Sequence, residues 1–166
     1  ANPDVFAKLL RRRHLISYGA FGVVYEVDGA AIKIGCIPDS EPVIQQWVCE
    51  QYERALPVWA FASDVILPKV VTHEVCPQHG FLSSLWTRTS VNCHCGERLD
   101  ALAMPLAERA DQRKVGEEDF SEKVYEAVLK KFQVSLDIHK GNFLEFNGKL
   151  TLCDFGDAND KAVDYW

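Results

Sequence analysis

Three polar side chains near the end of the printed sequence have the types and the spacing that metal-assisted proton transfer needs. Asp137 is followed five residues later by Asn142, and Asp154 comes twelve residues after the amide. Carboxylate and amide oxygens are suitable ligands for Mg²⁺, a hard cation that also keeps several of its waters. A further carboxylate nearby can orient a hydroxyl group and accept its proton. The spacing therefore indicates a magnesium site at Asn142 and Asp154, with Asp137 as the general base.

A β-hairpin is predicted between Asn142 and Asp154. The apolar runs 143–146 and 150–153 have the length of strands, and Asn147-Gly148 between them is a strong hairpin-turn signal. Since a hairpin brings its two ends together, we expect Asn142 and Asp154 to lie side by side. The alternative is an ordinary hairpin that is followed by a chance Asp-Phe-Gly turn.

Small residues near the start of the chain are suited to phosphate binding. Ser17, Gly19 and Gly22 precede a strand predicted over 23–27. Small residues let backbone N–H groups approach phosphate oxygens closely. A dinucleotide-binding glycine motif would instead open a helix, so that interpretation is disfavoured.

Lys33 lies near the end of the next predicted strand, 30–34, which follows an Asp28-Gly29 turn. A lone lysine in this position is commonly a solvated charge at the edge of a sheet. Because Lys33 follows a glycine-containing hairpin and precedes the acidic segment, we favour phosphate binding.

Two helices are predicted from the spacing of apolar residues. Residues 39–56 place apolar side chains on one face, with Glu50 at its edge and Glu53 further round. Residues 120–134 have a wide apolar face and lead directly into Asp137.

Together these segments resemble the protein-kinase superfamily from about Leu15 to Gly156. Residues 135–142 with Asp154-Phe155-Gly156 resemble the catalytic loop and the Asp-Phe-Gly motif. Ser17–Val24 resembles the glycine-rich loop, with Ser17 in place of its first glycine, and Ala31-Ile32-Lys33 resembles the third-strand lysine motif. Kinases also place a helix immediately before the catalytic loop.

The resemblance implies ATP and Mg²⁺ as cofactors and a role for each matching residue. Asp137 would orient or deprotonate the substrate hydroxyl, and Asn142 and Asp154 would bind Mg²⁺. Lys33 would bind phosphates, positioned by Glu50, although a solvated glutamate is the alternative for Glu50. Further residues that would contact the nucleotide are Ser17, Gly19, Gly22, Met104, Leu106, Ala107, His139 and Lys140.

Within that set, three assignments have alternatives. Met104 is the expected gatekeeper beside the adenine, and because Pro105 has no N–H group, the backbone donor to the adenine is Leu106 or Ala107. Either His139 or Lys140 would contact the γ-phosphate. His139 could instead be a core histidine that hydrogen-bonds the backbone.

The catalytic loop favours particular branches of the superfamily. Its Asp-x-His-x-Gly-Asn pattern is similar to that of aminoglycoside and choline kinases, and Ser135 makes it similar also to early protein kinases of tailed bacteriophages. The small-molecule kinases need a large helical lobe, and only ten residues follow Gly156, so the phage-type kinase is the better match. The alternatives are a nucleotide-binding pseudokinase that blocks a host protein and a truncated small-molecule kinase.

The implied fold class is α+β, as a single two-lobe domain over 1–166. The amino-terminal lobe, 1–106, would contain a five-stranded antiparallel sheet with one helix, and the reduced lobe would span 107–166. The expected strands are 15–18, 23–27, 30–34, 65–75 and 99–106.

An insertion is expected at 76–98. It contains Cys76, His79, Cys93 and Cys95, which could form a tetrahedral zinc site. The alternative is reduced cysteines in a long hairpin.

The composition of the chain restricts the kinds of partner and the cell compartment that we expect. The chain has 166 residues and a net charge of −6, which does not suggest nucleic-acid binding. The sequence has no apolar run of membrane-spanning length and no secretory signal. Its six cysteines therefore indicate reduced thiols in the cytoplasm. If the protein is encoded by a phage, this would be the cytoplasm of the host cell. We expect a protein substrate or a host protein as the target. We also expect the tail Tyr165-Trp166 to contact a second copy of the chain, forming a homodimer, or a partner protein. The alternative is that the tail folds back onto its own lobe.

Overall fold

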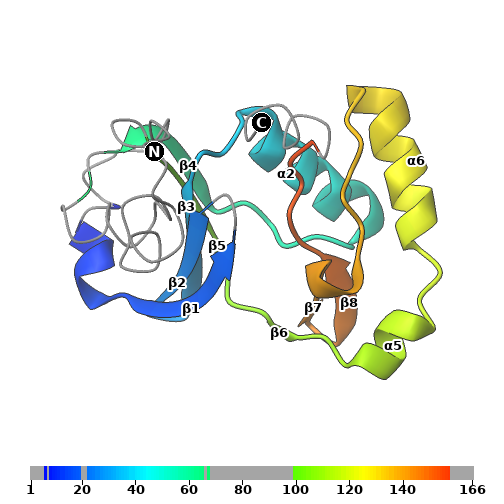
Figure 1. Ribbon diagram of the computed structural model, residues 1–166, viewed down its shortest axis with the longest axis horizontal. Coiled ribbons are helices and arrows are strands. Elements are labelled where there is room, and N and C mark those ends of the chain that lie inside the picture. The colour runs from blue at the N-terminus through cyan, green and yellow to red at the C-terminus, as the bar shows by residue number, and fades with distance from the viewer. Residues whose placement is uncertain (1–5, 7, 20–21, 66, 68–98, 158–166) are drawn as a thin grey trace, which may run out of the picture. The chain divides into compact units, whose positions relative to one another are not determined.

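The computed structural model describes residues 6, 8–19, 22–65, 67 and 99–157. The chain forms two compact units (Figure 1): the first comprises Ala1–Ile37 and Trp59–Leu106, and the second Pro38–Val58 and Ala107–Trp166. The fold is the expected α+β type, with a five-stranded antiparallel sheet and few helices. In the described part of the chain, no helix combines the length and the apolarity that a membrane crossing requires.

The first unit is built on the five-stranded sheet, whose strand order is β1-β2-β3-β5-β4 with every pair antiparallel. A short 3-10 turn, η1, precedes it. The bounds are η1 Leu10–Arg12, β1 His14–Gly19, β2 Gly22–Val27, β3 Ala30–Gly35, β4 Ala60–Val65 and β5 Leu99–Pro105. Four of the five predicted strands are confirmed.

The predicted strand 65–75 was placed wrongly, because β4 spans Ala60–Val65 and ends where that strand was expected to begin. Residues 66 and 68–75 lie outside the described residues. The sequence of β4 contains two alanines, a serine and an aspartate, so its local propensity is weak. Since β5 is buried, its backbone groups need partners on both sides, and pairing with β4 satisfies one side.

Alternating side chains of β2 form the centre of the first core. Val23, Tyr25 and Val27 are buried, and Ile32 and Ile34 of β3 join them. Full burial of one such side chain stabilises the fold by roughly 1.5–3 kcal/mol relative to leaving it exposed. The core therefore holds β3, the strand that carries Lys33, in a defined register.

The second unit contains α2, two further helices and a three-stranded sheet of order β6-β7-β8. Its elements are α2 Ser40–Tyr52, β6 Glu108–Arg109, α5 Gln112–Gly116, α6 Ser121–Phe132, η2 Lys140–Asn142, β7 Phe143–Phe146 and β8 Lys149–Leu152. Helix α2 ends four residues before the predicted end at residue 56, because Glu53 adopts a left-handed conformation with φ 53°. The elements β6 and α5 were not predicted.

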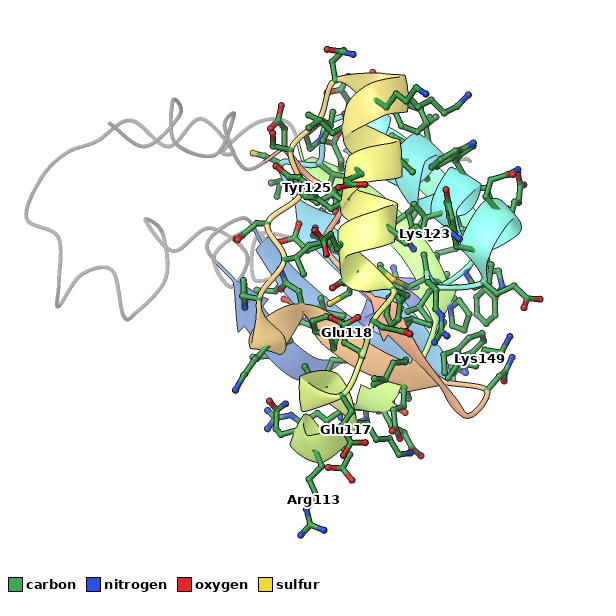
Figure 2. All side chains as sticks on the ribbon, turned by 90° about the vertical axis from the view of Figure 1, so that its right-hand side faces the viewer. Arg113, Glu117, Glu118, Lys123, Tyr125 and Lys149 are labelled. Carbon is green, nitrogen blue, oxygen red and sulfur yellow. The ribbon has the colours of Figure 1, made fainter. Side chains whose placement is uncertain are left out.

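Helices α2 and α6 pack together over the second core. Val48 of α2 and Val124 and Val128 of α6 are fully buried. The rings of Trp47 and Phe132 meet edge to face, with centroids 5.4 Å apart. Figure 2 shows Glu118 at the start of α6, where its carboxylate accepts hydrogen bonds from the backbone N–H groups of Phe120 and Ser121 and so caps the helix.

The residues after α2 bind the β7–β8 hairpin. The backbone N–H of Leu152 donates to the carbonyl of Arg54 at 2.8 Å, and the Arg54 guanidinium donates to the carbonyl of Leu150 at 3.1 Å. The same guanidinium lies 4.3 Å from the centre of the Phe120 ring. Lys149, visible on the hairpin in Figure 2, donates to the Glu53 carboxylate at 2.6 Å, and this hydrogen bond lowers the pKa of Glu53. Hydrogen bonds from both the backbone and the side chains thus join the hairpin to the end of α2.

The hairpin turn generates a prediction about stability. Gly148 has φ 75°, a left-handed conformation that an alanine side chain opposes. Gly148→Ala should lower the free energy of unfolding by about 1 kcal/mol, measured by urea denaturation. Gly116→Ala is the matched control: Gly116 lies in α5 with open space around it, so this change should be neutral or stabilising. Equal losses in both variants would contradict the argument.

Candidate active site

The predicted hairpin is present and carries the polar residues of the candidate site. Phe143 pairs with Leu152 in the antiparallel register, and the turn residues Asn147 and Gly148 both have positive φ, 51° and 75°. Two positive φ values are the mark of a type I′ turn, whose twist matches that of the strands. The backbone N–H of Cys153 donates to the carbonyl of Asn142 at 2.9 Å. This bond brings Asn142 next to the segment that continues into Asp154.

Asn142 is the buried polar residue at the centre of this arrangement, with a relative exposure of 8%. Its side-chain Nδ2 donates to the backbone carbonyl of Asp137 at 2.6 Å. Its backbone N–H donates to the carbonyl of His139 at 2.9 Å. Because the Asn142 amide nitrogen is used in holding the loop, its amide oxygen is the atom that could bind a cation.

Asp154 has φ 67°, so it lies in the left-handed region. Aspartate tolerates this conformation better than most residues with a side chain, and such outliers concentrate at functional sites. The neighbouring Phe155 is 1% exposed and packs in the second core, which fixes the backbone on that side. The Gly156 N–H lies 3.5 Å from Asp154 Oδ1. The segment is therefore anchored by Phe155 and turns sharply at the half-buried carboxylate.

Asp137 follows the buried Leu136, which forms an isolated antiparallel bridge with Asp157. Its own side chain is 49% exposed. His139 Nε2 lies 3.8 Å from Asp137 Oδ2, and the Gly141 N–H donates to His139 Nδ1 at 3.1 Å. His139 thus hydrogen-bonds the backbone through Nδ1, but its ring is exposed, so it is not the core histidine considered as the alternative. Lys140 is exposed in η2.

The residues expected to contact a nucleotide in the first unit lie along the sheet. Gly19 and Gly22 pair across β1 and β2, and residues 20 and 21 lie outside the described residues. Ser17 is exposed and pairs with Val24. Lys33 is half-buried in β3, opposite Val24 and Leu102 on its two neighbouring strands.

The end of β5 bears on the choice between Leu106 and Ala107 as the backbone donor to an adenine. Met104 is buried in β5. The Leu106 N–H donates to the Gly29 carbonyl at 3.3 Å. Since that N–H is already used within the first unit, Ala107 is the better candidate for a backbone donor to an adenine.

Helix α2 carries a buried carboxylate that the sequence reasoning missed. Glu50 is exposed and accepts a hydrogen bond from Gln46 Nε2 at 2.9 Å. Glu41, in the first helical turn, is only 3% exposed, and Gln45 is equally buried. Glu41 shares the helix face of Ile44, Gln45 and Val48, and this i, i+3, i+4, i+7 spacing is the signal that could have identified it.

The proposed zinc ligands Cys76, His79, Cys93 and Cys95 lie outside the described residues. Among the residues that are described, no group of three or more histidine, cysteine and acidic side chains is placed to hold a metal ion. Cys36, Cys49 and Cys153 are in the reduced form. Burial, followed by the charges of Glu50 and Glu53, raises the pKa of the Cys49 thiol.

The hydrogen bond from Asn142 to Asp137 predicts the effect of a minimal substitution. Asn142→Asp replaces only the donating NH₂ group by oxygen, so two acceptors then face each other in a buried place. The free energy of unfolding should fall by about 1–3 kcal/mol at neutral pH. Asn147→Asp, the same substitution in the exposed turn, should change it by less than about 0.5 kcal/mol. Thermal denaturation of both variants checks this, and equal stabilities would remove the structural role of the Asn142 amide.

Comparison with known proteins finds similarity among solved structures. No protein-family model matches the sequence, and no curated protein matches it. A solved structure of a MAP kinase from Leishmania major is similar to 92% of this chain, with 16% sequence identity and a TM-score of 0.39. The match covers 49% of the MAP kinase, so this chain spans about half the length of that protein.

Proposed function

We propose that this chain is a kinase that transfers a phosphoryl group from ATP, in the presence of Mg²⁺, to a hydroxyl group of a protein. One observation carries the proposal: the hairpin and the Asn142–Asp137 hydrogen bond gather Asp137, Asn142 and Asp154 in one small region. An acidic residue for the substrate and two oxygen ligands for a cation are the groups that phosphoryl transfer uses in kinases.

The donor set at the hairpin fits magnesium. Asn142 and Asp154 offer an amide and a carboxylate oxygen, and a hard cation that retains most of its waters needs few protein ligands. When bound, the ion would neutralise charge on the phosphate oxygens. The Cys153–Asn142 backbone bond and the buried Phe155 hold the backbone beside these two residues, which supports the proposed role.

The remaining roles follow the resemblance. Lys33 would bind nucleotide phosphates, and the backbone at Gly19 and Gly22 would cover them. Asp137 would accept a hydrogen bond from the substrate hydroxyl and then its proton. Its side chain is 49% exposed, so a substrate hydroxyl can reach it.

The narrower proposals rest on the motif at 135–142. We propose a serine or threonine hydroxyl of a host protein as the acceptor, and a relationship to the early kinases of tailed bacteriophages. The expected contact with a partner protein or a second copy stays a prediction, because the tail residues Tyr165 and Trp166 lie outside the described residues.

Substitutions of the phosphate-binding, metal-binding and proton-accepting residues test the proposal. Lys33→Ala and Asp154→Asn should abolish transfer from radiolabelled ATP, because catalysis depends on charge placed at the phosphates. Asparagine tolerates the left-handed backbone, so Asp154→Asn should keep the fold. Asp137→Asn should lower the rate about 10²–10⁴-fold while ATP binding survives. Thermal denaturation of each variant is the folding control.

Two outcomes would contradict the kinase assignment. Full activity in Lys33→Ala or Asp154→Asn would show that the transfer comes from a contaminating enzyme. ATP binding by the wild-type chain without any transfer to itself or to casein would favour the nucleotide-binding module instead.

The role that the resemblance gives Glu50 can be tested by a conservative variant. Glu50 is exposed and accepts a hydrogen bond from Gln46, and an exposed carboxylate can remain in water. We therefore expect Glu50→Gln, which keeps the size of the side chain and the helix propensity, to leave phosphoryl transfer close to wild type. A loss of tenfold or more would support Glu50 as the residue that positions Lys33.

A further inference from the structure

The ring of His139 is held in one orientation by its own loop. Nδ1 accepts a hydrogen bond from the Gly141 N–H at 3.1 Å, so Nδ1 carries the lone pair and the neutral ring carries its hydrogen on Nε2. The His139 carbonyl also accepts the Asn142 N–H at 2.9 Å. Both the backbone and the ring of His139 are therefore fixed relative to the residues of the candidate active site.

Gly141 is the residue that allows this orientation. A Cβ atom at position 141 would lie 2.9 Å from Cε1 and 3.1 Å from Nδ1 of His139; the first distance is shorter than real Cβ contacts and the second is shorter than most of them. Its φ is not positive, so the glycine is not required for the backbone conformation. The imidazole ring packs directly against Gly141, so a side chain at position 141 would displace the ring.

The remaining ring nitrogen faces Asp137. His139 Nε2 lies 3.8 Å from Asp137 Oδ2, beyond a hydrogen bond but within electrostatic range. The Asp137 carboxylate is half exposed, and its backbone carbonyl is held by Asn142. The side chain of a general base must still be directed at the proton that it accepts, and a displacement of about 1 Å can cost about 10²-fold in rate.

We propose that His139 is a positioning residue that orients the Asp137 carboxylate through its Nε2–H, and that it does not bind the γ-phosphate. This inference rests on the proposed kinase function, and it adds a residue pair, His139 with Gly141, to the machinery of that site. Gly141 holds the ring, the ring restrains the carboxylate, and Asp137 meets the substrate hydroxyl.

Two near-isosteric substitutions separate the functions of the two ring nitrogens. In His139→Asn, the side-chain oxygen can still accept the Gly141 N–H in an Asx turn, but the Nε2 donor is gone. In His139→Gln, an NH₂ group can reach the Nε2 position, while the bond to Gly141 is lost. Gly141→Ala keeps the histidine and displaces its ring.

The inference predicts how each variant behaves in kinetic measurements with Mg²⁺-ATP and with casein as the acceptor. His139→Asn should leave the melting temperature and the KM for ATP unchanged and lower kcat about 10–100-fold. Gly141→Ala should lower kcat to a similar extent, and His139→Gln should recover part of it. In an Asp137→Asn background, His139→Asn should cause no further loss.

Three kinetic results would overturn the inference. A wild-type kcat in His139→Asn would mean that the ring only caps the loop. A higher KM for ATP with unchanged kcat would make His139 a phosphate ligand. A further loss in the Asp137→Asn background would mean that the ring acts independently of the carboxylate.

A spectroscopic measurement distinguishes failure of this inference from failure of the proposed function. In nitrogen-15 NMR spectra of the wild-type chain, His139 should be the Nε2–H tautomer, and Asp137→Asn should shift its Nε2 resonance. If the wild type transfers no phosphate but this shift occurs, the proposed function fails and the contact stands. If no shift occurs, the positioning role is wrong whatever the activity.

Discussion

The hydrogen bond from the Asn142 amide to the Asp137 carbonyl is the interaction on which the candidate site depends. It joins the loop before the β7–β8 hairpin to the residue at which the hairpin begins, and Asn142 is almost fully buried. A buried donor of this kind costs about 1–3 kcal/mol when its partner is lost, so the bond holds the loop firmly. The catalytic candidate Asp137 and the cation-ligand candidate Asn142 are therefore positioned by one side chain.

The hairpin that carries this bond is in turn held by the second unit as a whole. The residues after α2 bind β8 through the Arg54 carbonyl and guanidinium, and Phe155 anchors the segment beyond it in the core shared by α2 and α6. This means that the metal-ligand candidates lie on a hairpin supported by two helices. A site that must hold a cation and an acidic side chain at a fixed spacing needs such rigid support.

Two local features lie close to this hydrogen bond. Asp154 adopts a left-handed conformation, and the imidazole of His139 packs directly against Gly141. Neither feature belongs to the hairpin turn, whose residues are Asn147 and Gly148. Left-handed residues other than glycine concentrate at functional sites, so the conformation of Asp154 supports the choice of this region as the candidate site.

The sequence by itself determined the elements whose signals are local. The Asn-Gly turn with its flanking strands, the strands around Lys33 and the helix before Asp137 were predictable, because turn chemistry and periodicity act over a few residues. Tertiary structure decided the rest. β4 forms from a weak strand sequence because β5 needs a partner; Glu41 is buried although helix surfaces favour glutamate; and the tautomer of His139 depends on the backbone of Gly141. In each case the deciding partner lies on another element or depends on the folded path of a loop, which no local pattern encodes.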